Sequence, residues 1–154
     1  ENNINVTLHA DWEVPEGIKE VVLDSKAKRV GHGSQIINDI SIENGSITFK
    51  NDAAKYVFNN KIALEICPTS NVQCGAYSHV SEHSFGDLYN AGFNVTINTD
   101  NRLMSDITMS EEVNNVVESF GLGEKDILNI TKNTIDAGFV ESKLRNELLD
   151  KLST

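Results

Sequence analysis

The sequence has few basic residues, no long apolar run and only two cysteines, and each shortage excludes a class of protein. Its 154 residues contain 13 Lys and Arg against 23 Asp and Glu, which gives a formal net charge of −10. Because nucleic-acid binders use a basic patch to neutralise phosphates, we expect no nucleic-acid partner. The apolar runs are only a few residues long, too short to span a bilayer, so we expect no membrane association.

The beginning of the chain and its cysteines predict a compartment. Residues 1–4 lack the basic and apolar regions of a signal peptide. Cys67 and Cys74 are close enough in sequence to form a disulfide, but nothing else indicates an oxidising environment. We therefore expect a cytoplasmic protein. With 39% hydrophobic residues, no repeat and no Pro-rich linker, residues 1–154 are expected to form a single region with one core.

Four short apolar, β-prone runs each end in polar residues that are suited to chemistry. These runs are residues 5–11, 28–33, 62–71 and 93–100, and helical patterns separate them. A strand buried on both faces reads as a short apolar run, and intervening helices indicate a parallel sheet with right-handed crossovers. Within residues 34–50, Asn44-Gly45 predicts a small β-hairpin, inserted before a helix at 52–58.

Further helices are predicted from capping residues and apolar spacing. Pro15 and Glu16 suit the first turn of one helix, and Thr108-Met-Ser-Glu111 fits a capping box at the start of another. A loop rich in Gly, Ser and His is expected between the third strand and a helix at 85–91. Two more helical stretches, 124–137 and 141–152, follow.

Four parallel strands cannot close a barrel, because a packed interior takes about eight strands. An open α/β sheet usually has a glycine-rich phosphate loop after its first strand, and residues 9–12 lack that pattern. We therefore predict an α/β fold that is half of a (β/α)8 barrel. The carboxyl ends of barrel strands build the active site, so His9, His32 and Asp100 are expected to converge where a metal ion can bind.

Three segments together resemble the adenosine deaminase family, within the metal-dependent amidohydrolase barrels. They are Arg29-Val-Gly-His32-Gly33, Leu64-Glu-Ile-Cys-Pro-Thr-Ser-Asn71 and Val95-Thr-Ile-Asn-Thr-Asp100-Asn-Arg-Leu-Met104. Their order and spacing match the carboxyl-terminal half of that TIM barrel, strands five to eight with the closing helices, over essentially the whole chain. The resemblance implies a hydrolase of purine and nucleotide metabolism. In the intact parent, such an enzyme would use Zn²⁺ for hydrolytic deamination of adenosine to inosine.

The resemblance also implies a role for individual residues. His9 is similar to the family's third zinc-ligating histidine, and Asp100 to the aspartate that completes the zinc shell. His32 resembles the histidine that holds and deprotonates the water that zinc activates. Asn101 stands where many members have a second aspartate that contacts the purine, and an amide retains that contact.

The stretch after His9 departs from the family pattern. Members follow this histidine with Ala-Gly-Glu, whose glutamate protonates the purine, whereas this chain continues with Ala10, Asp11, Trp12 and Glu13. Asp11 occupies the glycine position and is assigned to substrate binding. Glu13 comes one residue late. Either Glu13 still reaches the ring as general acid, or the motif is damaged and the rate falls by roughly 10²–10⁴-fold.

The family's His-x-His pair is missing, so two expected zinc ligands lie outside this chain. The chain alone is therefore expected to be inactive. Because the cut edges of the sheet leave backbone groups unpaired, we expect it to associate with the missing amino-terminal half-barrel or with itself. One alternative is a non-catalytic homologue that binds a purine nucleoside or a protein partner. Another keeps the chemistry but changes the substrate to a different aminopurine.

Other polar residues have structural interpretations. We expect residues 67–71 to serve packing and the capping of a loop rather than catalysis. His79 and His83, in the same loop, are expected not to bind metal. Glu65 points to the opposite face from Leu64, and a buried carboxylate there needs a partner.

Overall fold

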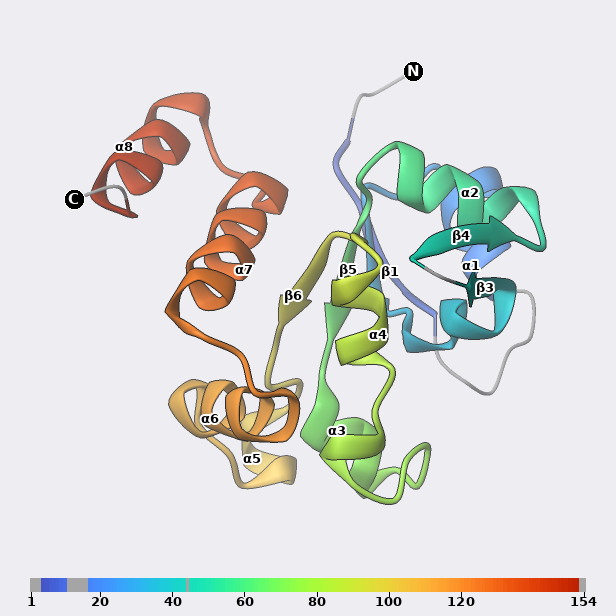
Figure 1. Ribbon diagram of the computed structural model, residues 1–154. Coiled ribbons are helices and arrows are strands. Elements are labelled where there is room, and N and C mark those ends of the chain that lie inside the picture. The colour runs from blue at the N-terminus through green and yellow to red at the C-terminus, as the bar shows by residue number, and fades with distance from the viewer. Residues whose placement is uncertain (1–3, 11–16, 44, 153–154) are drawn as a thin grey trace.

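A four-stranded parallel sheet forms the centre of the computed structural model, which describes residues 4–10, 17–43 and 45–152. The strands lie in the order β1 (Thr7–Ala10), β2 (Arg29–His32), β5 (Ala63–Ile66) and β6 (Val95–Ile97), and each pairs in parallel with its neighbour. Figure 1 shows the strands side by side with helices around them. The predicted α/β fold with four parallel strands is confirmed.

The predicted hairpin insertion is also present. β3 (Ile40–Glu43) and β4 (Ser46–Phe49) pair antiparallel, with Glu43 opposite Ser46. Residue 44 lies outside the described residues, and Gly45 has a φ of 76°, which suits a tight hairpin turn. The hairpin packs beside α2 (Asp52–Asn59), the helix that leads into β5 (Figure 1).

Most predicted helices occur where they were expected. The chain forms α1 (Gly17–Lys19), the π-helical turn η1 (Glu20–Asp24), α4 (Phe85–Asn90), α6 (Met109–Phe120), α7 (Glu124–Ala137) and α8 (Ser142–Leu152). The 3-10 helix η2 (Ser34–Asp39) was not predicted. The helix start predicted at Pro15 and Glu16 lies outside the described residues. At α6 the capping box is confirmed, since Glu111 N–H donates to Thr108 Oγ1 over 3.3 Å and Thr108 N–H donates to the Glu111 carboxylate over 2.8 Å.

Residues 67–84 correct one prediction, because they are not simply a loop. They contain α3 (Pro68–Gln73) and the 3-10 turn η3 (Val80–Glu82), and α5 (Arg102–Ser105) forms a further short helix after β6. Pro68 occupies the first turn of α3, where its missing N–H leaves no hydrogen bond unmade. The polar residues that follow Pro68 therefore project from a helix rather than from a mobile connection.

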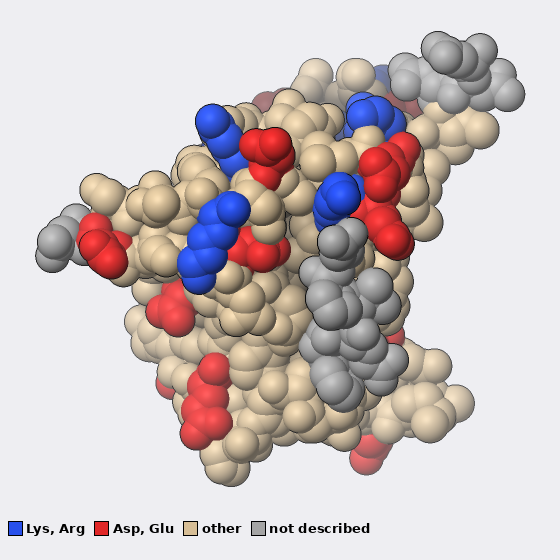
Figure 2. Space-filling model, turned by 90° about the vertical axis from the view of Figure 1, so that its right-hand side faces the viewer, with Lys and Arg blue, Asp and Glu red and all other residues tan. Residues whose placement is uncertain are grey.

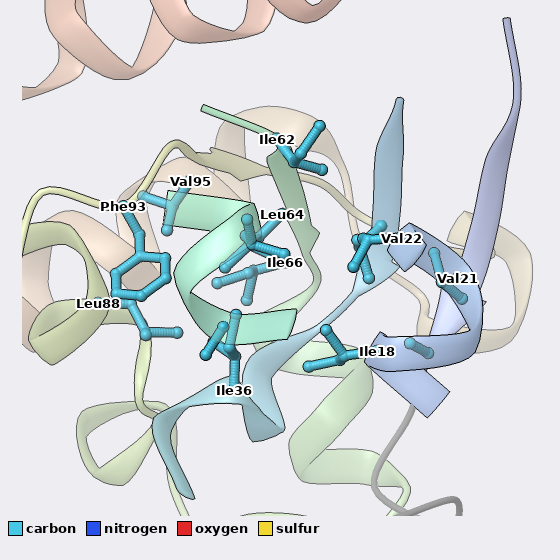
Figure 3. Close-up of a cluster of buried hydrophobic side chains, with 14 of the residues drawn as sticks. Ile18, Val21, Val22, Ile36, Ile62, Leu64, Ile66, Leu88, Phe93 and Val95 are labelled. Carbon is cyan, nitrogen blue, oxygen red and sulfur yellow. The ribbon is translucent and has the colours of Figure 1, made fainter. Parts of the chain in front are cut away.

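One face of the sheet carries the apolar core. Val30, Leu64 and Val95 are adjacent in register and fully buried. Figure 3 shows side chains of the surrounding helices, including Ile18, Ile36 and Leu88, gathered around Leu64 and Ile66; burying each such side chain fully stabilises the fold by about 1.5–3 kcal/mol. This burial fixes which face of every strand turns toward the helices.

The opposite face of the sheet is polar. His9, Gly31, Glu65 and Thr96 share this face because they are neighbours in register. Glu65 has the partners that a carboxylate there needs: Thr7 Oγ1 donates to it over 2.5 Å, and Arg29 Nε lies 3.1 Å from its Oε1. In a closed barrel this face would form the interior.

Charge is unevenly spread over one face of the molecule. Figure 2 shows Lys and Arg side chains in the upper part of one face, whereas the charged side chains in its lower part are Asp and Glu. The upper part lies toward the amino ends of the strands and the lower part toward their carboxyl ends. Among the described helices, none combines the length and apolarity that crossing a membrane requires.

Candidate active site

The carboxyl ends of β1, β2 and β6 bring three predicted site residues together. His9 lies in β1, His32 is the last residue of β2, and Asp100 follows β6. The ring centroids of His9 and His32 are 4.6 Å apart, and His32 Nε2 lies 3.7 Å from Asp100 Oδ2. His32 is buried, His9 is exposed, and the Asp100 side chain is 42% exposed. The convergence expected from the sequence is present, while the catalytic and metal-binding roles of these residues stay predictions.

Left-handed backbone at two of these residues explains how the convergence arises. His32 and Asp100 each have a φ of 57°, a conformation that is uncommon for residues with a side chain. Strand alternation alone would place the His32 ring on the apolar face, two residues after Val30. The left-handed turn at the strand end instead places the ring beside His9, which belongs to the polar face.

The glycines on either side of His32 are required by neighbouring strands. A Cβ at Gly31 would lie 3.3 Å from the Cα of His9, and at Gly33 it would lie 2.9 Å from Leu64 Cδ2. Gly33 also has a φ of 69°, so a side chain there would be strained as well as crowded. The two glycines therefore allow the close approach of β2 to β1 and to the core.

Helix α3 orients the Asp100 carboxylate. Ser70 lies in the first turn of α3, and its Oγ donates a hydrogen bond to Asp100 Oδ2 over 2.7 Å. This bond fixes one carboxylate oxygen at the edge of the site without neutralising the charge. Ser70 was expected to cap a loop, and the structure instead places it in contact with a candidate ligand.

A buried carboxylate fixes the position of α3. Glu112 of α6 has no exposed surface, and it accepts hydrogen bonds from Thr69 N–H over 2.9 Å and from Thr69 Oγ1. Both donors belong to the first turn of α3, so the bonds join α3 to α6. A buried charge requires such partners. The side chains of Ser70 and Asn71 are therefore presented to the site from a fixed helix.

Asn71 and His83 extend the site beneath His32. Asn71 Nδ2 lies 3.2 Å from His32 Nδ1, and Asn71 Oδ1 lies 3.1 Å from His83 Nε2. Burial, followed by the neighbouring charge of His32, lowers the pKa of His83 to about 4. Sequence reasoning did not assign these residues to the site. A proline directly after a strand was the available signal, since it predicts a helix whose first turn lies at the strand's carboxyl end.

Cys67 lies close to the site, and its thiol is protonated at neutral pH when no metal is bound. Single ligand atoms of His32, Cys67 and Asp100 all lie within 4.8 Å of one another. Burial, and next the charge of Asp100, raises the pKa of the Cys67 thiol to about 12. Because a metal binds the thiolate, Cys67 would have to lose this proton to act as a ligand. Neither Cys67 nor Cys74 forms a disulfide.

Of the remaining predicted site residues, the structure describes Asn101 alone. The Asn101 side chain accepts a hydrogen bond from Met104 N–H over 3.2 Å and caps α5, so its predicted purine contact stays a prediction. Asp11 and Glu13 lie outside the described residues. A cavity of about 740 Å³ lies at the opposite, amino end of the strands, where Lys28, Ile62 and Phe93 line it.

Comparisons with known proteins find similar proteins along the whole length of this chain. The family model described as adenosine deaminase matches residues 1–154. Adenosine deaminases of Mycobacterium marinum and Mycobacterium leprae are each 39% identical, over 154 and 153 residues. The alignments cover 99% and 98% of this chain but 42% of each relative. The chain thus spans less than half the length of these relatives.

Solved structures of similar fold include three deaminases or amidohydrolases. The N6-methyl-AMP deaminase of Arabidopsis thaliana is 29% identical with a TM-score of 0.76, and the match covers 97% of this chain and 40% of that one. An adenine deaminase from Arthrobacter aurescens gives a TM-score of 0.85 at 20% identity, with 97% and 43% covered. An amidohydrolase from Burkhoderia ambifaria, solved with bound Zn, gives 0.73 at 20% identity, with 97% and 42% covered.

At 20% identity the last two structures show the fold alone, and that fold is part of a TIM barrel. The predicted half-barrel architecture is therefore confirmed. The match of the family model over every residue and the identity to the mycobacterial enzymes establish more than the fold. The chain belongs to the adenosine deaminase family.

Proposed function

We propose that this chain, once a second segment completes the barrel, performs zinc-dependent hydrolytic deamination of adenosine to inosine. The observation that carries the proposal is the convergence of His9, His32 and Asp100 at the carboxyl ends of three strands. Two imidazoles and a carboxylate are the ligand types that catalytic zinc sites use. The relatives named adenosine deaminase support the choice of reaction.

The donors that are present fit a zinc ion. Zinc binds imidazole nitrogen and carboxylate oxygen at about 2.0–2.2 Å, so two ligand atoms of one ion lie at most roughly 4.3 Å apart. His32 Nε2 lies 3.7 Å from Asp100 Oδ2, so the ring that we assign to the water is close to one of the two proposed ligands. We assign His9 and Asp100 as ligands, with the other two supplied from outside this chain. When bound, zinc supplies a water whose pKa is lowered to about 7.

The chain's own residues would orient this water and the substrate. Ser70 holds Asp100 Oδ2, so the carboxylate keeps one direction, and the His32 ring edge faces the same space. The water would add at C6 of the purine, the bond from C6 to the amino group would break, and ammonia would leave. Glu13 is the proposed general acid for the purine ring, and Asp11 and Asn101 are the proposed substrate contacts.

The half-barrel leaves surfaces for a completing segment. Among the described strands, β1 and β6 each pair with one neighbour, so each has an edge without a described partner strand. Leu103 and Met104 are 89% and 78% exposed beside the carboxyl end of β6. Unpaired strand edges and exposed apolar side chains favour association. We propose the missing half-barrel as the partner, with a second copy of this chain as the alternative.

Reconstitution tests the function directly. The chain is co-expressed with the part of Mycobacterium marinum adenosine deaminase that it does not cover, and the complex is purified. We expect one zinc ion per complex and conversion of adenosine to inosine, measured by metal analysis and ultraviolet absorbance. The chain alone should show neither, since it lacks two ligands.

A matched pair of histidine variants provides the control. His9→Gln should remove zinc and activity from the complex, whereas His79→Gln, a change at an exposed loop residue, should preserve both. A folded complex that binds adenosine without turnover would instead support the non-catalytic alternative. No binding of adenosine and no turnover, with zinc bound, would contradict both functions.

The substrate is the least constrained part of the proposal. One relative acts on N6-methyl-AMP and another on adenine, according to their names. Assaying adenosine, adenine and N6-methyl-AMP in parallel would therefore identify the aminopurine. The two free cysteines are compatible with a reducing compartment, and we propose that the protein acts in the cytoplasm, in purine metabolism.

A further inference from the structure

Three buried side chains form one continuous row of hydrogen bonds below the site. His32 is 7% exposed, Asn71 1% and His83 3%, and they come from β2, from α3 and from the residue after η3. The amide of Asn71 lies between the two rings, 3.2 Å from His32 Nδ1 and 3.1 Å from His83 Nε2. Each contact needs one donor and one acceptor, so the position of one hydrogen fixes the next.

A backbone hydrogen bond determines which ring nitrogen of His83, at the end of the row, carries the hydrogen. Phe85 N–H donates to His83 Nδ1 over 2.9 Å. A backbone N–H has no acceptor function, so Nδ1 must be the nitrogen without hydrogen. The lowered pKa of His83, about 4, means that this ring is neutral at pH 7. Its single ring hydrogen therefore lies on Nε2, which faces Asn71.

The amide orientation follows from this hydrogen. His83 Nε2–H donates to Asn71, so the oxygen of the amide, Oδ1, must be the atom that faces His83. A reversed amide would place its NH₂ group against the Nε2–H and leave two donors facing each other. The correct orientation directs Nδ2 toward His32, and Nδ2 donates to His32 Nδ1. His32 Nδ1 then accepts this hydrogen bond and carries no hydrogen, so the ring hydrogen of His32 lies on Nε2.

We propose that Asn71 and His83 are positioning residues that select the His32 tautomer with hydrogen on Nε2. This nitrogen is the one that lies 3.7 Å from Asp100 Oδ2. The meaning of the tautomer for catalysis rests on the deaminase function proposed above. In that reaction His32 presents an N–H donor to the attacking water and holds its oxygen in place.

This assignment changes the role that the family resemblance implies for His32. A histidine that deprotonates the water through Nε2 needs a free electron pair on that nitrogen. Here the free electron pair of the neutral ring is on Nδ1, where Asn71 occupies it. His32 is therefore a hydrogen-bond donor to the water before any proton moves.

Nuclear magnetic resonance of the imidazole nitrogens tests the tautomer without requiring activity. The full 154-residue chain contains four histidines, so its ¹⁵N-labelled form gives four ring patterns. The spectrum of His32→Gln identifies the signals of His32 by their loss. At neutral pH we expect the wild-type chain to show hydrogen on His32 Nε2 and none on Nδ1. Hydrogen on Nδ1 of His32 in the wild-type chain would overturn the proposal.

Asn71→Asp tests whether the row selects the tautomer. A carboxylate at this position accepts from both rings, so His32 should acquire a hydrogen on Nδ1. Asn114→Asp is the control, because it makes the same change at an exposed position of α6, away from the row. The control should keep the wild-type tautomer. A His32 Nδ1 that stays without hydrogen in Asn71→Asp would also overturn the proposal.

Kinetics of the reconstituted complex separate positioning from general stability. Asn71→Leu removes the donor without adding charge, and we expect a loss of about 10–100-fold in kcat with little change in KM. The outcome of the spectroscopic test and the outcome of the reconstitution test do not depend on each other. A complex without deaminase activity contradicts the proposed function and leaves the tautomer assignment standing, whereas the wrong tautomer in an active complex contradicts only the assignment.

Discussion

Left-handed backbone occurs at both ends of the sheet, in different surroundings. His32 ends β2 and Asp100 follows β6, both with φ values of 57°. Lys26 and Lys61 precede β2 and β5 with values of 58° and 51°. Such a conformation costs a residue with a side chain roughly 1–2 kcal/mol. Both lysines are exposed, so at the amino ends of the strands the left-handed conformation forms a turn. At the carboxyl ends it directs an imidazole and a carboxylate toward each other.

The supporting structure differs in the same way. The carboxyl-end residues are held by side chains of α3, which Glu112 in turn holds from α6. At the amino ends lies the wide cavity that Lys28 and Lys61 help to line. A cavity by itself therefore does not identify the site here. Strained backbone is a pointer to function when buried hydrogen-bonded side chains hold it in place.

Replacing Asp100 with asparagine should have the largest effect at the carboxyl end. Loss of the carboxylate charge at the reacting centre is expected to remove zinc from the completed barrel and to lower kcat/KM by at least about 10³-fold. Metal analysis and initial rates measure both. Asp106→Asn is the matched control, because Asp106 is exposed and asparagine tolerates its left-handed φ of 47°. Equal losses in the two variants would refute the assignment of Asp100.

Replacing Glu112 with alanine tests the support of α3. The change leaves the half-buried Thr69 donors without an acceptor and opens a cavity where Glu112 was buried. We expect the free energy of unfolding to fall by about 3 kcal/mol. Urea denaturation measures this change. Glu118→Ala, an exposed position on the same helix, should shift the midpoint only slightly. Similar shifts for both would mean that Glu112 does not anchor α3.

Acid should weaken the carboxyl end through His83. Its pKa is about 4 in the folded chain against 6.5 in the unfolded chain, so between these values the unfolded state binds more protons. Stability is therefore complete above pH 6.5 and falls as the pH decreases toward 4, by at most about 3 kcal/mol. Urea denaturation at several pH values follows the loss. His83→Gln should flatten the pH dependence and the exposed His79→Gln should not; an identical slope in all three proteins would exclude His83 as the cause.

Replacing Lys26 with glycine should give the smallest of these effects. It tests the left-handed backbone at the amino ends of the strands. Glycine adopts the left-handed conformation freely, so relief of strain should slightly exceed the added chain entropy. We expect a stabilisation of about 0.5 kcal/mol, read as a rise in the urea midpoint. Lys28→Gly, without left-handed backbone to relieve, should instead destabilise by roughly 0.5–1 kcal/mol. Destabilisation by Lys26→Gly would show that this turn has a further role.

The sequence predicted those features whose signals are local. Apolar runs located the four strands, Asn44-Gly45 located the hairpin, and Thr108 with Glu111 located the start of α6. The convergence at the carboxyl ends followed from the rule that parallel strands share one edge. The fold and the nearness of His9, His32 and Asp100 can thus be predicted from the sequence.

The supporting contacts were not accessible, because they join residues far apart in the chain. Ser70 meets Asp100 across 30 positions, Asn71 meets His32 across 39, and Thr69 meets Glu112 across 43. Helix α3 is too short for a periodic pattern, and its composition reads as a loop. The residue type of His32 is also a weak signal for its left-handed backbone, since only a minority of histidines adopt it even though histidine is enriched there.

The contrasting positions of the two cysteines make the chain suitable for site-selective labelling. The thiol of Cys67 is buried with a pKa of about 12, so it should resist alkylation and oxidation while the chain is folded. Cys74 is exposed at the end of α3. A maleimide dye would therefore attach at one place, next to the helix that orients Asp100 and His32. Its fluorescence would report on docking of the second half-barrel, with no engineered thiol.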